Sequence, residues 1–344
     1  MLGPLMRNVW LAFRWSLEAV AAGLALVAAA AAVGAEGGRW NDKLDLLAHF
    51  ALVWLALGAL AFILSWASPS VARGTLIRLA ALVAVLAAGG LMLPDFTRPR
   101  SSPADASAPH QVKLIEFNQW GANSDPDRVV AWIAAQHPDL VVIVEPDPAV
   151  EPKLRQATGL KTYMADNMIV AARHGFIRTR VNWDVHNLPG QGFYLNWPEI
   201  YGFDGKPFTL MGAHSGWPIP ARRARAEALH LTLTLDTIDR PSTILAGDFN
   251  STQWSYIRRQ ADEAIGLERR DRALPSWPAR LPMLQGRDFP VPFLPIDHIY
   301  AGGQWRTVKV ERGPKLGSDH YPLIATLAWD GPVGGDRSLW PDAR

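Results

Sequence analysis

Long apolar runs are concentrated in the first hundred residues of the chain. Three of them, separated by short polar loops, span residues 19–34, 46–67 and 76–93. A helix needs about 20 apolar residues to cross a bilayer. The second run meets this length by itself, and the others meet it if Arg14 and Arg78 extend their charges to the membrane surface. The pattern therefore predicts three transmembrane helices within residues 1–94. The alternative, buried core helices of a soluble protein, is disfavoured by the short polar loops.

The pattern changes after the third run. Residues 95–110 are rich in Pro, Ser and Ala without periodicity, which is typical of a linker. Residues 111–329 alternate apolar runs with amphipathic stretches, which predicts a second domain of strands and helices. The expected strands span residues 112–117, 140–144, 168–172, 208–212, 243–246, 296–301, 307–310 and 323–327. The expected helices begin at Asp125 and span residues 222–237 and 253–261. The Gly-, Pro- and Asp-rich tail at 330–344 is expected to be disordered.

Composition limits the classes of function. The 344 residues are 49% hydrophobic and 19% charged, which is apolar for a soluble enzyme. The formal net charge is only +2, so bulk charge gives no argument for a nucleic-acid partner. The chain has no Cys, which excludes disulfides, thiolate metal sites and cysteine nucleophiles.

Polar side chains stand at the ends of the expected strands. Two compact motifs are among them, Gly-Asp-Phe-Asn at 247–250 and Ser-Asp-His-Tyr-Pro at 318–322. The strand-end acids, amides and imidazoles are Asn118, Glu145, His214, Asp248, Asn250, Asp297, Asp319 and His320. A rigid sheet that presents such groups from several strand ends can hold a divalent cation and orient a water molecule. The set therefore predicts metal-assisted hydrolysis of a phosphate ester.

In these motifs the sequence resembles the endonuclease/exonuclease/phosphatase superfamily, which includes DNase I-like nucleases, inositol-phosphate phosphatases and sphingomyelinases. The resemblance covers residues 112–327 and rests on the two motifs with Asp297 between them. It implies an α/β fold, a four-layer α/β/β/α sandwich of two mixed sheets, with a divalent-metal site at one end. The spacing of the strands alone does not distinguish this fold from other α/β hydrolases.

The resemblance also implies a set of metal ligands. Glu145 corresponds to the principal Mg²⁺ ligand of the family, and Asn118 and Asp319 lie where the family completes the metal neighbourhood. Mg²⁺ prefers oxygen ligands and usually keeps several waters. Mn²⁺ is the alternative ion.

The remaining motif residues resemble the catalytic groups of the family. Asp248 and Asn250 correspond to the pair that orients or deprotonates the attacking water. His320 corresponds to the imidazole that contacts the scissile phosphate, and Asp297 would fix its tautomer and favour its protonated form. His214 would stabilise the phosphoryl oxygens or assist the leaving group.

Four residues near the motifs have a structural interpretation beside the functional one. His298 should point away from Asp297, because successive strand residues face opposite sides, and we expect it to be structural. Trp120, Trp217 and Trp254 each closely follow a site motif. They predict either an amphipathic rim that faces the membrane or an acyl chain, or ordinary packing beneath the loops.

The charges that flank the apolar runs slightly favour a cytoplasmic N-terminus. Three spans then place the C-terminal domain outside the cytoplasm. These features predict a multi-pass protein of the bacterial inner membrane with an extracytoplasmic catalytic domain.

The substrate has to be inferred from features outside the fold, because a fold does not fix it. The anchor favours a phosphate ester or pyrophosphate that is lipid-linked, with membrane lipids as neighbours. The layout is similar to that of membrane-anchored bacterial relatives associated with glycopeptide resistance and undecaprenyl-pyrophosphate dephosphorylation. An extracytoplasmic nuclease is the alternative, in which the same Trp residues would stack on nucleotides. A non-catalytic, membrane-tethered binding module is disfavoured because no motif residue is missing. No protein partner is inferred.

Overall fold

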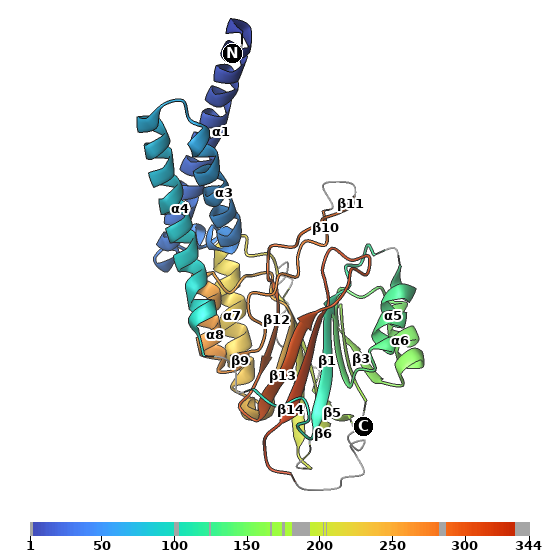
Figure 1. The fold of residues 1–344 in the computed structure, drawn as a ribbon. Helices are drawn as coiled ribbons and strands as arrows, with labels where there is room; N and C mark the ends of the chain where they lie inside the picture. The colour runs from blue at the N-terminus through green and yellow to red at the C-terminus, as the bar shows by residue number, and fades with distance from the viewer. Residues whose placement is uncertain are drawn as a thin grey trace. The chain divides into compact units, whose positions relative to one another are not determined.

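The computed structural model of the chain contains two compact units (Figure 1). One comprises Met1–Arg98 with Gln253–Ile257, and the other comprises Pro99–Thr252 with Arg258–Arg344. The structure describes residues 3–99, 103–123, 125–165, 167–173, 176–180, 193–201, 203, 205–281 and 287–333. Most of the tail at 330–344 that was expected to be disordered lies outside the described residues.

The first unit is helical. Its helices are α1 (Pro4–Glu36), α2 (Asp42–Asp45), α3 (Ala51–Leu64) and α4 (Val71–Thr97), with short 3₁₀ turns η1 (Gly37–Arg39), η2 (Ala48–Phe50) and η3 (Ser65–Ala67). Among the described residues, three helical stretches are long and apolar enough to cross a membrane, Leu5–Arg39, Asp42–Ala67 and Val71–Thr97. They coincide with the three predicted apolar runs.

Small residues line the interior of the helical unit. Ala21, Ala61 and Ala81 are fully buried together in one cluster. A Cβ atom on Gly58 would lie only 3.0 Å from the Cβ of Ala84, so α3 and α4 approach each other closely. Small residues permit this close packing between membrane helices.

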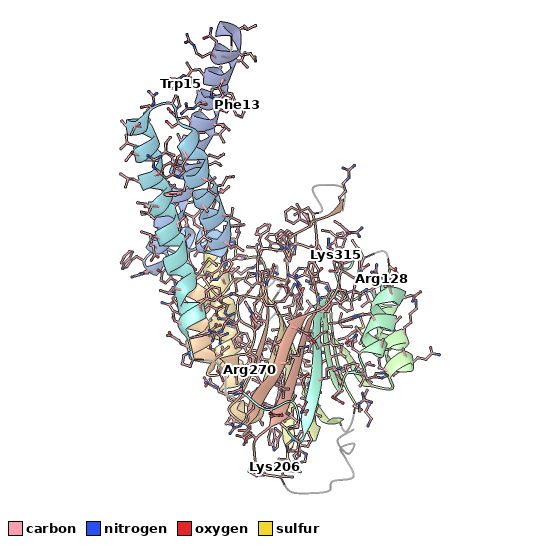
Figure 2. The ribbon with its side chains drawn as sticks, in the orientation of Figure 1. Phe13, Trp15, Arg128, Lys206, Arg270 and Lys315 are labelled. Carbon is pink, nitrogen blue, oxygen red and sulfur yellow. The ribbon has the colours of Figure 1, made fainter. Side chains whose placement is uncertain are left out.

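Large apolar side chains cover the outside of the same helices. Figure 2 labels Phe13 and Trp15 on α1, and both are exposed. Leu26, Ile63 and Leu86 are more than 60% exposed, which suits a lipid environment but not water.

Two charged side chains in the first half of α1 contact the turn between α3 and α4 and the start of α4. Arg14 donates from Nε to the Ala67 carbonyl at 2.8 Å and from Nη2 to the Ser68 carbonyl at 2.7 Å. Arg73 pairs with Glu18 at 2.7 Å. Arg14 therefore lies level with the turn between α3 and α4.

Residues 253–257 pack with the helices of the first unit. Trp254 is only 1% exposed and lies in an apolar cluster with Ala35, Ala48 and Leu91. The sequence interpretation of Trp254 as part of an exposed rim is therefore wrong. The position after Asn250 gave no sign of this packing, because the partners come from the first hundred residues.

The second unit is built on two mixed six-stranded sheets. Their strand orders are β13-β14-β1-β2-β4-β3 and β5-β6-β7-β8-β12-β9. The first sheet contains β1 (Gln111–Asn118), β2 (Leu140–Val144), β3 (Lys161–Ala165), β4 (Met168–Ala172), β13 (Trp305–Arg312) and β14 (Leu323–Trp329). The second contains β5 (Phe176–Arg180), β6 (Tyr194–Tyr201), β7 (Pro207–His214), β8 (Ile244–Asp248), β9 (Glu268–Arg269) and β12 (Asp297–Ala301). A separate hairpin joins β10 (Arg280–Leu281) to β11 (Arg287–Asp288).

Helices cover the outer face of each sheet (Figure 1). The helices are α5 (Pro126–Ala135), α6 (Val150–Thr158), α7 (Ala221–Leu235) and α8 (Tyr256–Ile265), with a 3₁₀ turn η4 (Arg240–Ser242). Val129 of α5 packs on the first sheet and Leu231 of α7 on the second. Side chains of both sheets, such as Val142 and Ile299, form the cluster between them. The predicted four-layer sandwich is confirmed.

Candidate active site

The expected site residues lie at neighbouring strand ends of the two sheets. β1 and β2 pair in parallel, with Asn118 opposite Val144, so Glu145 follows beside Asn118. β7 and β8 also pair in parallel, with His214 opposite Asp248. Asp297 begins β12 directly opposite Asp248. The two sheets therefore present their polar side chains at one end of the sandwich.

A continuous series of contacts joins these side chains. The His214 Nε2 lies 3.4 Å from Glu145 Oε1. The Asn118 Nδ2 lies 3.4 Å from that same oxygen and donates to Asp248 Oδ2 at 3.0 Å. His320 Nε2 lies 3.7 Å from Asp248 Oδ2. Because Asn118 presents its N–H to two carboxylates, it holds Glu145 and Asp248 near each other.

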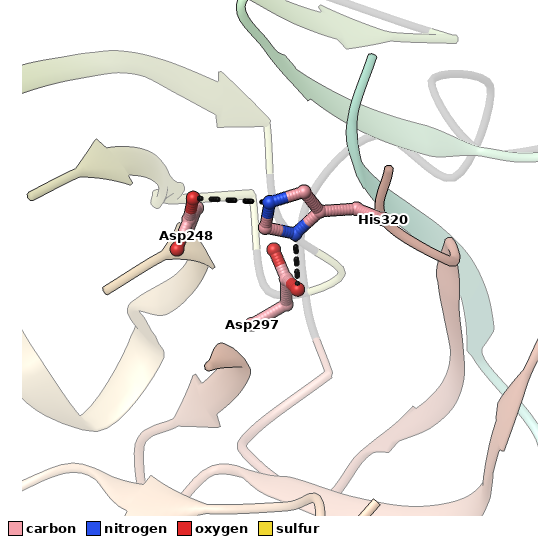
Figure 3. A group of neighbouring side chains, drawn as sticks. All are labelled: Asp248, Asp297 and His320. Atoms are coloured by element: carbon pink, nitrogen blue, oxygen red, sulfur yellow. Dashed lines mark hydrogen bonds and ion pairs between the residues drawn. The ribbon is translucent and has the colours of Figure 1, made fainter. Parts of the chain in front are cut away.

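His320 lies between two buried carboxylates (Figure 3). Its Nδ1 is 2.8 Å from Asp297 Oδ2, while Nε2 faces Asp248. Burial alone would lower the pKa of His320, but the carboxylates of Asp297 and Asp248 raise it to about 10. The imidazole is therefore a cation at neutral pH, and Asp297 orients it as the sequence suggested.

Asp248 has a pKa suited to proton transfer. Burial, followed by the negative charge of Asp297, raises the pKa of Asp248 to about 7. A carboxyl with this pKa exchanges protons readily near neutral pH, as a general base must. His214 differs, because burial and the positive His320 lower its pKa to about 4. His214 is therefore neutral at pH 7, and it can donate a hydrogen bond without adding charge.

Asn250 sits in a tightly constrained turn after β8. Its backbone has φ of 46°, in the left-handed region that Asn tolerates better than most residues. Its N–H donates to Asp248 Oδ1 at 2.7 Å, and its Nδ2 donates to the Ser215 carbonyl at 2.8 Å. Gly247 precedes the turn, and a Cβ there would lie 1.8 Å from the Ala213 oxygen. Only Gly fits that position.

Two residues of the site were not singled out from the sequence. Ser318 donates to the Asn118 carbonyl at 2.7 Å and accepts from the His320 N–H at 2.9 Å, so it ties β1 to the last motif. Trp277 Nε1 donates to Asp319 Oδ2 at 3.2 Å. Ser318 could have been found because it belongs to the motif at 318–322. Trp277 lies 42 residues away from Asp319, and no local pattern links the two.

Buried carboxylates beside His320 offer candidate ligand atoms for a divalent cation. Asp248, Asp297 and His320 form a candidate metal group, because one ligand atom from each lies within 4.8 Å of the others. Asp297 Oδ1 is buried without a hydrogen-bond partner among the described residues. Glu145 adds a more exposed carboxylate beside this group. Carboxylate oxygens are the ligands that Mg²⁺ prefers.

Comparison with known proteins identifies the class. The profile of the Endonuclease/Exonuclease/phosphatase family matches residues 115–320. The chain therefore belongs to this family and is a phosphoesterase hydrolase. No match is found among curated proteins.

Solved structures show the same fold at low sequence identity. An endonuclease/exonuclease/phosphatase family protein from Bacteroides thetaiotaomicron is 17% identical, with a TM-score of 0.51, over 64% of this chain and 99% of that one. A functionally unknown conserved protein from Enterococcus faecalis is 17% identical, with a TM-score of 0.50, over 63% and 99%. TDP2 from D. rerio, complexed with a single-strand DNA product, is 15% identical, with a TM-score of 0.50, over 63% and 98%. These likenesses establish the fold alone.

Proposed function

We propose that the protein is a membrane-anchored, divalent-metal-dependent phosphoesterase whose substrate is a lipid-linked phosphate ester or pyrophosphate. The observation that carries this proposal is the contact series from Glu145 through Asn118 and Asp248 to His320 and Asp297. The series contains a carboxylate that can hold a cation, a second carboxylate that can act as a base, and a buried imidazolium.

The metal ligands in this proposal are Glu145 and Asp319, with Asn118 as the hydrogen-bond donor that positions Glu145. The compact group of Asp248, Asp297 and His320 is the competing ligand set. We favour the first set because the His320 ring is held between two carboxylates as an imidazolium, and an imidazolium offers no lone pair to a cation. Mg²⁺, when bound, would neutralise charge on the phosphate and favour attack by water.

The catalytic roles follow from the charges of the side chains. Asp248, with its raised pKa, takes a proton from water while Asn250 orients it. The His320 imidazolium stabilises charge on a phosphoryl oxygen, and Asp297 keeps the ring protonated and oriented. The neutral His214 donates a hydrogen bond to another phosphoryl oxygen.

An aromatic surface beside the site supports a lipid-linked substrate. Trp277 donates to Asp319, and its ring contacts Trp217 edge to face at a centroid distance of 6.5 Å. Trp217 is 63% exposed and nearby Ile219 is 64% exposed. Exposed Trp and Ile beside a polar site suit a ligand with a charged head and an apolar tail. Trp217 thus keeps its proposed role as a rim residue, and Trp277 joins it.

A nuclease is the second candidate, because the exposed Trp217 ring could stack on a base. The net charge of +2 gives little attraction for a polyanionic strand, which favours the lipid-linked substrate.

The test is a substrate panel with the purified full-length protein in detergent, with and without Mg²⁺. The panel contains bis-p-nitrophenyl phosphate, plasmid DNA, sphingomyelin and a polyprenyl pyrophosphate. We expect Mg²⁺-dependent hydrolysis with preference for a lipid-linked substrate, and Trp217→Ala should raise KM for the lipid while sparing the small diester.

Glu145→Gln should reduce activity by about 100-fold or more, because the carboxylate charge holds the cation. Preference for plasmid DNA would select the nuclease, and full activity of Glu145→Gln would exclude Glu145 as a ligand.

The proposed location places the catalytic domain outside the cytoplasm of a bacterial cell, anchored in the inner membrane. A C-terminal alkaline phosphatase fusion should therefore be active, and a C-terminal green fluorescent protein exported by the general pathway should be dark. The opposite pair of results would place the domain in the cytoplasm and favour nucleotide or nucleic-acid substrates.

A further inference from the structure

His298 is a fully buried imidazole that the catalytic roles above do not use. It is 0% exposed and is the second residue of β12, directly after Asp297. Successive residues on a strand face opposite sides. The Asp297 side chain therefore faces His320, and the His298 side chain faces the other surface of the second sheet, as the sequence predicted.

Both ring nitrogens of His298 lie beside oxygen atoms. Nδ1 is 2.8 Å from Asp271 Oδ2, and Nε2 is 3.0 Å from the Ser251 carbonyl oxygen. A carboxylate and a carbonyl can only accept hydrogen bonds, so the ring must donate from both nitrogens. Asp271 is 1% exposed and also accepts the Ile299 N–H at 2.9 Å, which fixes the carboxylate against β12.

The Ser251 carbonyl belongs to the turn that carries Asn250. Phe249 in the same turn donates its N–H to the Ile296 carbonyl at 2.9 Å, just before β12 begins. The turn includes the left-handed backbone at Asn250, a conformation that persists only when surrounding contacts hold it. His298 supplies one of these contacts, one residue beyond Asn250.

We propose that His298 is a positioning residue, which acts through the Ser251 carbonyl to hold the Asp248–Asn250 turn at a fixed spacing from His320. The first two residues of β12 then hold two different parts of the site in place. Asp297 holds His320 on the inner side, and His298 holds the turn on the outer side. The inference rests on the proposed roles of Asp248 and Asn250.

The test compares His298→Gln with His298→Leu and with Tyr300→Phe in the full-length protein. Gln keeps an amide N–H that can reach the Ser251 carbonyl, whereas Leu removes both donors. Tyr300 is the matched control, because it is 0% exposed, lies two residues along the same face of β12, and donates to Asp262 Oδ1 at 2.8 Å rather than to the turn. Tyr300→Phe therefore removes a buried hydrogen bond to Asp262, while the ring that remains keeps its edge contacts with Phe249 and His298.

Two measurements separate positioning from general stability. The first is amide hydrogen exchange of a peptide that covers residues 249–252, which needs neither substrate nor metal. We expect faster exchange in His298→Leu, an intermediate rate in His298→Gln, and the wild-type rate in Tyr300→Phe. The second is hydrolysis of bis-p-nitrophenyl phosphate, where kcat should fall about 10- to 100-fold in His298→Leu with KM unchanged, because small displacements of catalytic groups cost that much.

The outcomes distinguish this inference from the proposed function. Wild-type exchange in both His298 variants would overturn the inference, whatever the activity. Equal kcat losses in His298→Gln and Tyr300→Phe at equal losses of melting temperature would also overturn it, by reducing His298 to a stabilising residue. A wild-type protein without Mg²⁺-dependent activity would refute the proposed function alone, and the exchange experiment would still decide whether His298 holds the turn.

Discussion

The helical unit and the sandwich bury opposite kinds of side chain. The helical unit buries small residues such as Ala25 and Ala81, and exposes large ones such as Leu26 and Leu86. The sandwich buries large residues such as Trp305, which is 1% exposed. Water drives large apolar groups inward, whereas lipid accepts them on the surface and leaves small residues to let helices approach. The exposed surface of the helical unit is therefore one that lipid could accept, whereas the surface of the sandwich suits water.

The two units also place charged groups differently. The helical unit buries single charged side chains, such as Glu18, which pairs with Arg73 at 2.7 Å. The sandwich instead gathers Asp248, Asp297 and His320 in one buried group at its strand ends. Burying charges is costly unless they are paired, and the cost is tolerated where it prepares chemistry. This arrangement makes the sandwich the candidate reactive part of the chain.

The largest expected effect comes from breaking the buried ion pair of the sandwich. His320→Ala should lower kcat by about 10²- to 10⁴-fold, the usual range for a group that acts on the reacting phosphate. If Asp297 acts only through His320, the double alanine variant should be no less active than His320→Ala. The measurement is kcat on a small diester for His320→Ala, Asp297→Ala and the variant that carries both substitutions. Multiplicative losses would show that Asp297 has its own role, such as binding the cation.

The next largest effect tests the packing contrast with a matched pair of Trp residues. Trp305→Ala should cost about 3–5 kcal/mol of unfolding free energy, because it removes a buried side chain. Trp10 on α1 is 56% exposed, so Trp10→Ala should change the stability of the protein in detergent by less than about 1 kcal/mol. Thermal unfolding in one detergent compares the two. A comparable loss for Trp10→Ala would mean that its exposed face is covered in the folded protein.

Much of the fold could be predicted because its strongest patterns are local. The three apolar runs became helices, and the predicted strand at 140–144 is β2 with the same bounds. The edge strands β3 and β5, the inner strand β6 and the helix α6 were missed. β3 has exposed and half-buried residues instead of an apolar run, so its sequence carries a weak signal. Strand order could not be read from periodicity at all, because pairing such as that of β1 with β14 joins distant segments.

The sequence could name candidate site residues but not their contacts. The eight candidates were chosen because strand ends and family motifs mark them. The burial of Trp254 and the link between Trp277 and Asp319 depend on segments far apart in the chain. Nor could the sequence give the low pKa of His214, which arises from burial and from the charge of His320.

A smaller effect should appear in the pH dependence of the sandwich. The pKa of His320 is raised to about 10, so its contribution to stability is fully present below the unfolded pKa of about 6.5 and is lost as pH rises toward 10. Activity that needs the imidazolium should therefore persist through pH 9. Asp297→Asn removes one of the two raising charges and should move the alkaline decline of kcat to lower pH. Profiles of kcat against pH for the wild-type protein and for Asp297→Asn check this. An alkaline decline that stays at the same pH in both would show that a group other than His320 causes it.

The smallest effect compares two glycines of the helical unit. Gly23 is exposed on α1, and a Cβ added there would have no neighbouring atom within 4 Å, whereas a Cβ on Gly58 would meet Ala84 at 3.0 Å. Ala is favoured over Gly in a helix interior by about 0.5–1 kcal/mol. Gly23→Ala should therefore raise the melting temperature slightly in detergent. Gly58→Ala should gain nothing or lose stability, because α3 and α4 would have to separate by a few tenths of an ångström. Equal stabilisation by both substitutions would show that the interface between α3 and α4 is looser than its small residues imply, and would weaken the argument that small residues serve close helix packing in this unit.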